Sequence, residues 1–293
     1  MDLRHIRYFL AVAEERNFSR AAERVGIGQP PLSMQIRDLE REVGARLFHR
    51  VPKGAELTAA GQAFYRVVEK MPAMVEEACH AARRAERGEL GILRVGFTAS
   101  SGFNPVVATT IRSFRRGYPG VDVQLEESNT ARLFEALSGD ELDAAFMRPG
   151  EHLAKGLQVR VLSEEPLLAV LPSKHAFAKK QRLKLADLAG DELITFPRQY
   201  GSVMYDAIMT ACRDAGFEPQ LGQVAPQMAS IIHFVAAELG FALVPASMRE
   251  IQAKGVIFRE LHDTAASVQL SLAWRRGDRS PFLKNFIDCA LRA

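Results

Sequence analysis

The spacing of apolar residues changes at about residue 91, and this change limits what the chain can fold into more than any other feature. Before it, apolar side chains recur at helical spacing, as on one face of an α-helix. After it, short apolar runs alternate with helical patterns, which is typical of an α/β fold. The 293 residues suffice for about two domains. We therefore expect a helical N-terminal domain followed by an α/β domain.

The start of the chain predicts three helices separated by tight turns. An apolar stripe from Leu3 to Ala13 indicates the first helix. Ser19 is the predicted N-cap of a short second helix, Arg20 to Val25. The third begins at Gln29-Pro30-Pro31, because proline in a first helical turn loses no hydrogen bond, and it ends before Gly44. Two short helices joined by a glycine-containing turn are typical of a helix-turn-helix.

The polar face of the third predicted helix carries side chains that can bind base edges or phosphates, namely Ser33, Gln35, Arg37 and Arg41. The segment 48–54 that follows predicts a turn between two short strands, with Arg50 and Lys53 near its tip. Such a basic wing would lie against phosphates or in the minor groove. The net charge of +3 is too small to indicate nucleic-acid binding alone, so a merely solvated charged face is the alternative.

Thr58 is the predicted N-cap of a long helix that reaches about Glu89. Its apolar residues keep the spacing of a coiled-coil seam: Phe64, Val67, Met71, Met74 and Ala78. We expect this seam to join two copies of the chain, the alternative being that it packs on its own chain. Pro72 removes one helical hydrogen bond and should kink the helix, and the polar run 83–91 is expected to act as a hinge.

The remaining residues predict an α/β domain with largely parallel sheets. Strands are expected at 92–98, 121–126, 143–147, 167–171, 193–196, 241–245 and 268–274, and helices at 105–116, 131–137, 203–215 and 228–239. These two sets of elements imply two lobes of about 100 residues each, with a cleft between them.

Polar side chains follow the first three of these strands, where each strand ends: Thr98, Ser100 and Ser101, then Asn129 and Thr130, then Arg148. Ligands of open α/β sheets bind beyond the carboxyl ends of the strands, at helix N-termini that favour anions. These side chains therefore predict a site for a carboxylate. In the second lobe, Phe196 and Pro197 precede a helix that Ser202 could cap, and an apolar ring there would suit an aromatic or unsaturated acid. The alternative is that the hydroxyls only cap helices.

Several classes of protein are disfavoured by the sequence. A content of 47% hydrophobic and 25% charged residues is ordinary for a globular protein. Cys79, Cys212 and Cys289 match neither a disulfide framework nor a zinc motif and are expected to be buried, as is His233. We expect no metal, because neither HExxH nor another close His/Cys/Asp cluster occurs. We expect no cofactor and no catalytic activity, because neither a GxSxG elbow nor a P-loop occurs. With neither a signal peptide nor a membrane span expected, the predicted location is the cytoplasm.

Two segments carry a resemblance to a known family: NFSRAAERVGIGQPPLSMQIRDLEREVGARLFHR from Asn17 to Arg50, and LTAAGQAFY from Leu57 to Tyr65. Both resemble the LysR-type transcriptional regulators, in particular those that control aromatic-acid catabolism. The resemblance implies an all-α winged helix-turn-helix over 1–58 and a linker helix for dimerisation over 59–90. It also implies an α/β effector domain over 91–293, similar to two-lobed periplasmic binding proteins. Lobe I would comprise 91–163 and 265–293, and lobe II 164–264.

The resemblance also implies roles for individual residues. Gln29, Pro30, Pro31 and Ser33 would lie at the DNA end of the recognition helix, while Arg37, Arg50 and Lys53 would contact phosphates or the minor groove. Ser100, Thr130 and Arg148 would hold the carboxylate of a small acid. The expected partners are double-stranded operator DNA, the acid effector, and further copies of the chain in a homodimer or homotetramer, with RNA polymerase as a further candidate. Met34, where many members have arginine, and Pro72 depart from the family pattern.

Two other functions remain open from the sequence. The chain could be a DNA-architectural protein that responds to no effector, in which case operator binding would be indifferent to every metabolite. It could also be an enzyme with an α/β cleft fused to a DNA-binding segment, which turnover of a candidate acid would reveal.

Overall fold

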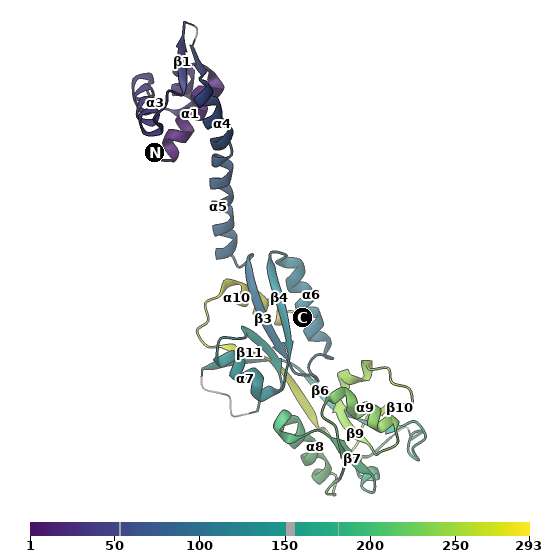
Figure 1. The fold of residues 1–293 in the computed structure, drawn as a ribbon. Coiled ribbons are helices and arrows are strands. Elements are labelled where there is room, and N and C mark those ends of the chain that lie inside the picture. The colour runs from purple at the N-terminus through teal and green to yellow at the C-terminus, as the bar shows by residue number, and fades with distance from the viewer. Residues whose placement is uncertain (53, 151–155, 181) are drawn as a thin grey trace. The chain divides into compact units, whose positions relative to one another are not determined.

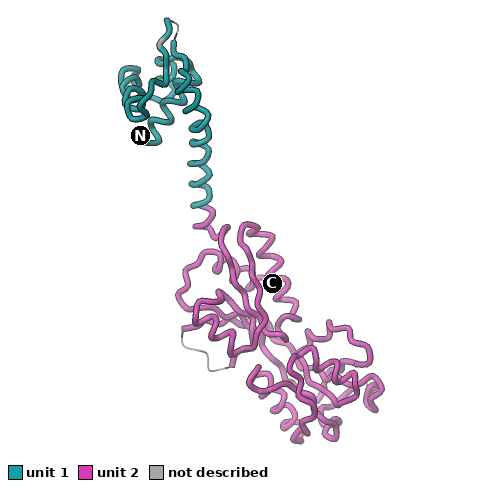
Figure 2. The backbone as a smooth tube through the Cα atoms, viewed as in Figure 1, with its two compact units in different colours: residues 1–83 teal, residues 84–293 magenta. Residues whose placement is uncertain are grey.

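The computed structural model describes residues 1–52, 54–150, 156–180 and 182–293. The chain forms two compact units, residues 1–83 and residues 84–293 (Figure 2), and each is described by itself.

The first unit is a three-helix core with a β-hairpin and the start of a helical linker (Figure 1). Its elements are α1 (Leu3–Glu15), α2 (Phe18–Val25), α3 (Gln29–Val43), β1 (Phe48–Val51), β2 (Gly54–Leu57), α4 (Ala59–Val68) and α5 (Met71–Glu86). The core is built around Phe9, whose ring meets Phe64 edge-on with the ring centroids 5.0 Å apart. Leu32, Leu39 and Leu47 are fully buried beside it. The three predicted helices and the wing strands are therefore present.

The N-cap of the second helix is Asn17, so the prediction of Ser19 was wrong. The Asn17 side-chain oxygen accepts hydrogen bonds from the backbone N–H of Ser19 at 2.9 Å and of Arg20 at 3.1 Å. Asparagine caps a helix at least as well as serine, and the apolar Phe18 directly after it packs against the core.

The single long helix predicted from Thr58 to Glu89 is two helices. Thr58 caps α4 as expected, because its hydroxyl accepts a hydrogen bond from Gly61 N–H at 2.9 Å. The chain turns at residues 69–70, and α5 begins one residue before Pro72. Proline has no N–H to bond the carbonyl one turn earlier and its ring would collide with that carbonyl, so it is tolerated only in a first turn. The helix is therefore interrupted just before Pro72 instead of being kinked there.

The second unit contains a mixed sheet, so the prediction of largely parallel sheets was wrong. Its strands are β3 (Gly91–Phe97), β4 (Val121–Glu127), β5 (Ala144–Met147), β6 (Leu157–Pro172), β9 (Ala242–Pro245), β10 (Val256–Arg259) and β11 (Ser267–Arg275). The strand order is β10-β6-β11-β5-β3-β4, and β9 also pairs with β6. Within this sheet, among the described residues, β3 pairs in parallel with β4 and β5, whereas β6 and β11 are antiparallel to their neighbours. The chain leaves the first lobe along β6 and returns along β11, which makes these adjacent strands antiparallel.

Helices cover the sheet in two lobes. The first lobe has α6 (Pro105–Gly117), α7 (Thr130–Ser138) and α10 (Pro281–Ala290), and the second has α8 (Ser202–Asp214) and α9 (Met228–Ala236) beside the parallel pair β7 (Glu192–Thr195) and β8 (Gln220–Val224). Phe114 of α6 meets Phe286 of α10 edge-on in the first core. The second core lies between α8, α9 and the far half of β6. Strands β6 and β11 run through both lobes, as Figure 1 shows.

Most of the polar run 83–91, predicted as a hinge, belongs to the second unit. There it is held against the start of α10. Asn285 donates a side-chain hydrogen bond to the Arg87 carbonyl at 2.8 Å. Gly88 has a positive φ of 69°, and a Cβ there would come within 2.5 Å of the Phe282 nitrogen. The close approach of α10 therefore requires glycine at this position.

The four residues predicted to be buried, three cysteines and His233, differ in their exposure to solvent. Cys212 is buried, and burial raises the pKa of its thiol to about 11. Cys289 is half-buried, while Cys79 is exposed on α5. His233 is exposed in the last turn of α9, because the buried side of that helix is already filled by Ile231, Ile232 and Val235. The predictions for Cys79 and His233 were therefore wrong.

Candidate functional site: a DNA-binding face and an interlobe pocket

The predicted DNA-contacting residues on α3 divide into an exposed set and one buried residue. Gln29, Pro30 and Pro31 are exposed in the first turn, and Arg37 is exposed two turns later. Ser33 is only 7% exposed, so its prediction as an outward residue was wrong. It follows the buried Leu32 and lies at the edge of the apolar stripe, where its hydroxyl accepts a hydrogen bond from the Gln29 side-chain amide at 3.0 Å. Ser33 therefore orients the Gln29 side chain.

The predicted wing is a two-stranded hairpin. Strands β1 and β2 pair antiparallel from Phe48 and Leu57 to Val51 and Gly54. The backbone N–H of Ala55 donates to the Arg16 carbonyl at 2.9 Å, which fixes the hairpin against the end of α1. Arg50 lies in β1, but the orientation of its side chain is outside the described structure, as is Lys53 altogether.

The predicted dimerisation residues also divide into two groups. Phe64 and Met71 are half-buried against the core of their own unit, which is the alternative considered for the whole seam. Val67, Met74 and Ala78 are exposed, and none of the described residues of α5 is buried. Two residues of the predicted seam therefore pack within their own unit and three are exposed, with the exposed Val67 between the two packed ones.

A pocket of about 380 Å³ lies between the two lobes of the second unit. Its first-lobe wall includes Thr98, Ser100, Thr130 and Arg148, and its second-lobe wall includes Phe196, Tyr200, Met204 and Met228. Five of the seven residues predicted for effector binding therefore line one pocket. Pro197 does not line it, and Ser101 is fully buried, where its hydroxyl donates to the Thr98 carbonyl at 2.8 Å and holds the turn after β3.

Three helices begin at this pocket. Thr130 is the first residue of α7, Gly201 precedes α8, and Met228 is the first residue of α9. Asn129 caps α7 by accepting from Arg132 N–H at 3.0 Å, whereas no described side chain caps α8 or α9. The prediction of Ser202 as a cap was therefore wrong. All three N-termini direct the positive end of a helix dipole toward the pocket, and the uncapped α8 and α9 also present free N–H groups, so the three together favour an anion there.

Arg148 is already paired on its buried side. The side chains of Arg148 and Glu165 are 4% and 9% exposed and form an ion pair, and Arg148 Nε donates to the Ser100 hydroxyl at 3.3 Å. Glu165, on β6, also accepts from the Asn104 amide at 3.1 Å and from Ser247 N–H at 2.9 Å. Burial alone would raise the pKa of Glu165, but Arg148 and Ser247 together lower it below its usual value.

This pairing determines which groups give the pocket a positive potential. The charge of Arg148 is balanced by Glu165, and Glu127 at the pocket wall adds a negative charge. The helix N-termini, rather than a free guanidinium, therefore supply the positive potential. The network also joins the lobes, because Asn104 precedes α6 in the first lobe and Ser247 follows β9 in the second. Glu165 was not among the predicted site residues.

A winged helix-turn-helix followed by a two-lobed unit with a pocket between its lobes defines a class of protein: regulators of transcription that combine DNA binding with ligand binding. Comparison with family models agrees. Residues 3–62 match the bacterial regulatory helix-turn-helix protein model of the lysR family, and residues 86–293 match the LysR substrate binding domain. The chain belongs to the LysR family of transcriptional regulators, whose members bind DNA and are not enzymes.

Similar proteins share the whole length of the chain. The HTH-type transcriptional regulator BudR of Raoultella terrigena is 38% identical over 288 residues, covering 98% of this chain and 99% of that protein. The Hca operon transcriptional activator HcaR of Escherichia coli is 32% identical over 289 residues, covering 98% and 96%. The crystal structure of full-length CbnR complexed with its target DNA covers 100% of this chain and 99% of that one, with 27% identity and a TM-score of 0.89.

The described part of the chain contains no helix long and apolar enough to cross a membrane. In the same residues, no group of three or more histidine, cysteine or acidic side chains could hold a metal ion.

Proposed function

We propose that this regulator binds a small carboxylic acid in the pocket between its lobes, and that the acid changes how a homo-oligomer of the chain binds operator DNA. The observation that carries the proposal is the meeting of three helix N-termini at one pocket. A carboxylate placed there would accept hydrogen bonds from backbone N–H groups and from the Ser100 and Thr130 hydroxyls.

The apolar part of the pocket supports an acid with a carbon skeleton of some size. Phe196, Met204 and Met228 form this part on the second lobe, opposite the polar strand ends of the first lobe. An aromatic or unsaturated skeleton would pack against these side chains while its carboxylate faces the helix ends. The Phe196 ring itself packs edge-on against Tyr205, with the ring centroids 6.2 Å apart.

The remaining roles are proposed from the exposed surfaces. Gln29, Pro30, Pro31 and Arg37 on α3 would enter the major groove, with Arg50 and Lys53 of the wing on the backbone or in the minor groove. The exposed apolar residues Val67, Met74 and Ala78 would join two copies of the chain. The oligomer would act in the cytoplasm on operator DNA, with RNA polymerase as a further partner.

The test is the thermal stability of the full-length protein in a panel of acids that includes benzoate, muconate and succinate. A ligand at about 100 times its Kd adds about 2.7 kcal/mol to the free energy of unfolding. A selective rise in melting temperature for one class of acid supports the proposal. No rise for any acid would contradict it and leave the family assignment intact.

A variant of the pocket tests where the acid binds. Thr130 lines the pocket, and its hydroxyl forms no hydrogen bond with the other described residues. Thr130→Val keeps the shape of the side chain and removes only the hydroxyl. We expect about tenfold weaker acid binding, because a hydrogen bond to a charged group contributes about 1.5 to 3 kcal/mol. Thr210→Val, an exposed position on α8, is the matched control and should leave the response unchanged.

A further inference from the structure

A large apolar side chain lies in the middle of the surface that α3 exposes to solvent. Met34 is 56% exposed, although it belongs to a helix whose other large aliphatic residues before its last turn, Leu32, Ile36 and Leu39, are almost completely buried. At 3.6 residues per turn, Met34 lies on the side of the helix opposite to these three. It therefore plays no part in the core of its own unit.

Two pairs of polar side chains on α3 are engaged within the helix itself. Gln29 donates its amide to Ser33, and Arg41 donates to the Asp38 carboxylate at 2.6 Å. Arg37, one turn after Met34, forms no ion pair with any of the described residues. The exposed face of α3 thus presents a thioether chain at its centre and a free guanidinium beside it.

In a helix-turn-helix the second helix lies in the major groove. Base edges there present hydrogen-bonding groups and one apolar group, the C5-methyl of thymine. We propose that Met34 reads a thymine in each operator half-site by packing against this methyl group. The unbranched methionine chain adapts its shape to such a contact without needing a hydrogen-bond partner. The proposal rests on α3 being the recognition helix.

The experiment begins with an operator selected from random duplex DNA by the full-length wild-type protein. Each thymine of that operator is then replaced by deoxyuridine, which removes only the C5-methyl group. Affinity is measured at one fixed salt concentration, because phosphate contacts make it salt-dependent. We expect one thymine per half-site at which the replacement weakens binding about fourfold, the value of one buried methyl-sized group.

Variants connect this effect to Met34. Met34→Ala should bind the thymine and deoxyuridine operators equally, whereas Met34→Leu should retain the preference. Met34→Arg should select guanine at that position in a new round of selection. Val43→Ala, at the end of the same helix, is the matched control and should keep the thymine preference. Unchanged melting temperatures would show that the variants are folded, as expected for an exposed side chain.

Two results would overturn the proposal. If deoxyuridine weakens wild type and Met34→Ala equally at every thymine, Met34 does not contact a methyl group, while operator binding stands. If no operator can be selected at all, the role of α3 as a recognition helix fails together with the proposal.

Discussion

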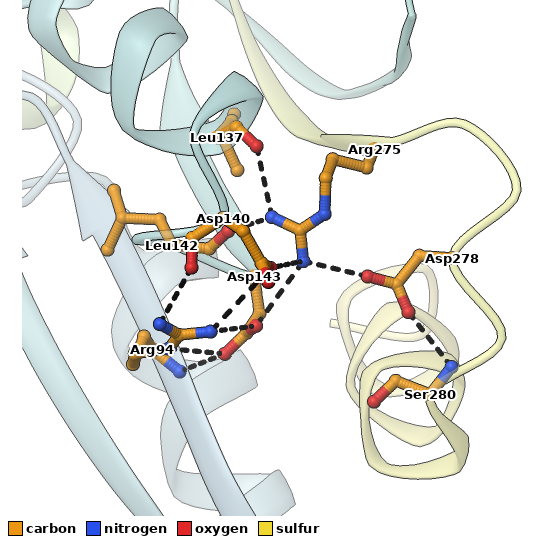
Figure 3. Close-up of polar contacts among 8 residues, drawn as sticks. All are labelled: Arg94, Leu137, Asp140, Leu142, Asp143, Arg275, Asp278 and Ser280. Atoms are coloured by element: carbon orange, nitrogen blue, oxygen red, sulfur yellow. Dashed lines mark hydrogen bonds and ion pairs between the residues drawn. The ribbon is translucent and has the colours of Figure 1, made fainter.

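Two arginine–carboxylate clusters in the second unit are built from similar residues but surrounded differently. The first joins Arg94, Asp143, Arg275 and Asp278 (Figure 3). Asp143 accepts from the Arg94 backbone N–H at 2.7 Å and from its Nη2 at 3.0 Å. Asp278 accepts from Arg275 at 2.8 Å and from Ser280 N–H at 2.9 Å. This cluster fastens β3, β5 and β11 to the start of α10 within one lobe.

The second cluster, Arg148 with Glu165, is almost completely buried, and its arginine lines the pocket. The side chains of Arg94 and Arg275 are 37% and 21% exposed, whereas that of Arg148 is 4% exposed. Arg94 and Arg275 each have carbonyl acceptors besides their carboxylates, so losing one partner leaves others. Besides Glu165, the only partners of Arg148 among the described residues are the Val268 carbonyl, in a long contact of 3.5 Å, and the Ser100 hydroxyl. The two clusters should therefore respond differently to the loss of a carboxylate.

The largest effect is expected from Glu165→Ala. Removing one partner of a buried ion pair leaves an uncompensated charge and costs about 3 to 5 kcal/mol. The free energy of unfolding of the second unit, measured by urea denaturation of the full-length protein, should fall by this amount. The variant should also bind the acid differently, because Arg148 lines the pocket and would be released from its partner.

The neighbouring Glu164→Ala provides the control for this change. Glu164 is exposed and its carboxylate bonds the Ser267 hydroxyl at the surface. We expect a change within about 0.5 kcal/mol, as for most surface substitutions. Equal losses of the free energy of unfolding for Glu165→Ala and Glu164→Ala would show that burial of the Arg148–Glu165 pair does not add to the cost of losing a carboxylate.

A smaller loss is expected from Asp143→Ala in the first cluster. The variant leaves the Arg94 backbone N–H without its acceptor, while both arginines keep other partners and partial access to water. A buried unsatisfied polar group costs about 1 to 3 kcal/mol. Because this cluster does not line the pocket, the thermal shift with an acid should be the same as in wild type. An altered acid response would remove the distinction between the two clusters.

The sequence predicted elements well where one repeating pattern decides them. The stripe of α1, the proline start of α3 and the apolar runs of β3, β4 and β5 all led to elements at the expected places. Strand β8 was not predicted, because its residues are mostly exposed and form no apolar run. Helix α10 was also not predicted, although Leu283, Phe286 and Ala290 repeat at helical spacing, so that signal was present in the sequence.

For the site, the sequence predicted which strand ends and which residue types would form it, but not which of two adjacent residues faces the pocket. Ser100 and Ser101 are adjacent and chemically identical, and the tight turn after β3 decides that only Ser100 lines the pocket. Glu164 and Glu165 are likewise indistinguishable in the sequence. The packing of β6 between the lobes places one outside and the other beside Arg148. The balance of charge in the pocket therefore depends on tertiary packing, which residue spacing does not encode.

The smallest expected effect is a pH dependence of the free energy of unfolding that is specific to Glu165. The pKa of Glu165 is lower in the folded chain than its unfolded value of about 4.3, because Arg148 and Ser247 favour the charged form. The ionised carboxylate therefore stabilises the fold fully above that unfolded value. This contribution is lost as the pH falls through the lower folded pKa.

Glu165→Gln removes the charge while keeping a side chain of the same size. Its free energy of unfolding should lie below that of wild type at pH 7, and the difference should narrow as the pH falls below about 4.3, because wild-type Glu165 then also becomes neutral. Denaturation curves of both proteins at several pH values give this difference directly. In Thr210→Val, which changes no titratable group, the difference from wild type should be the same at every pH. The difference in free energy of unfolding between Glu165→Gln and wild type could instead stay the same at every pH. In that case the ionised carboxylate is not what Arg148 stabilises, and the contrast between the two clusters loses its electrostatic basis.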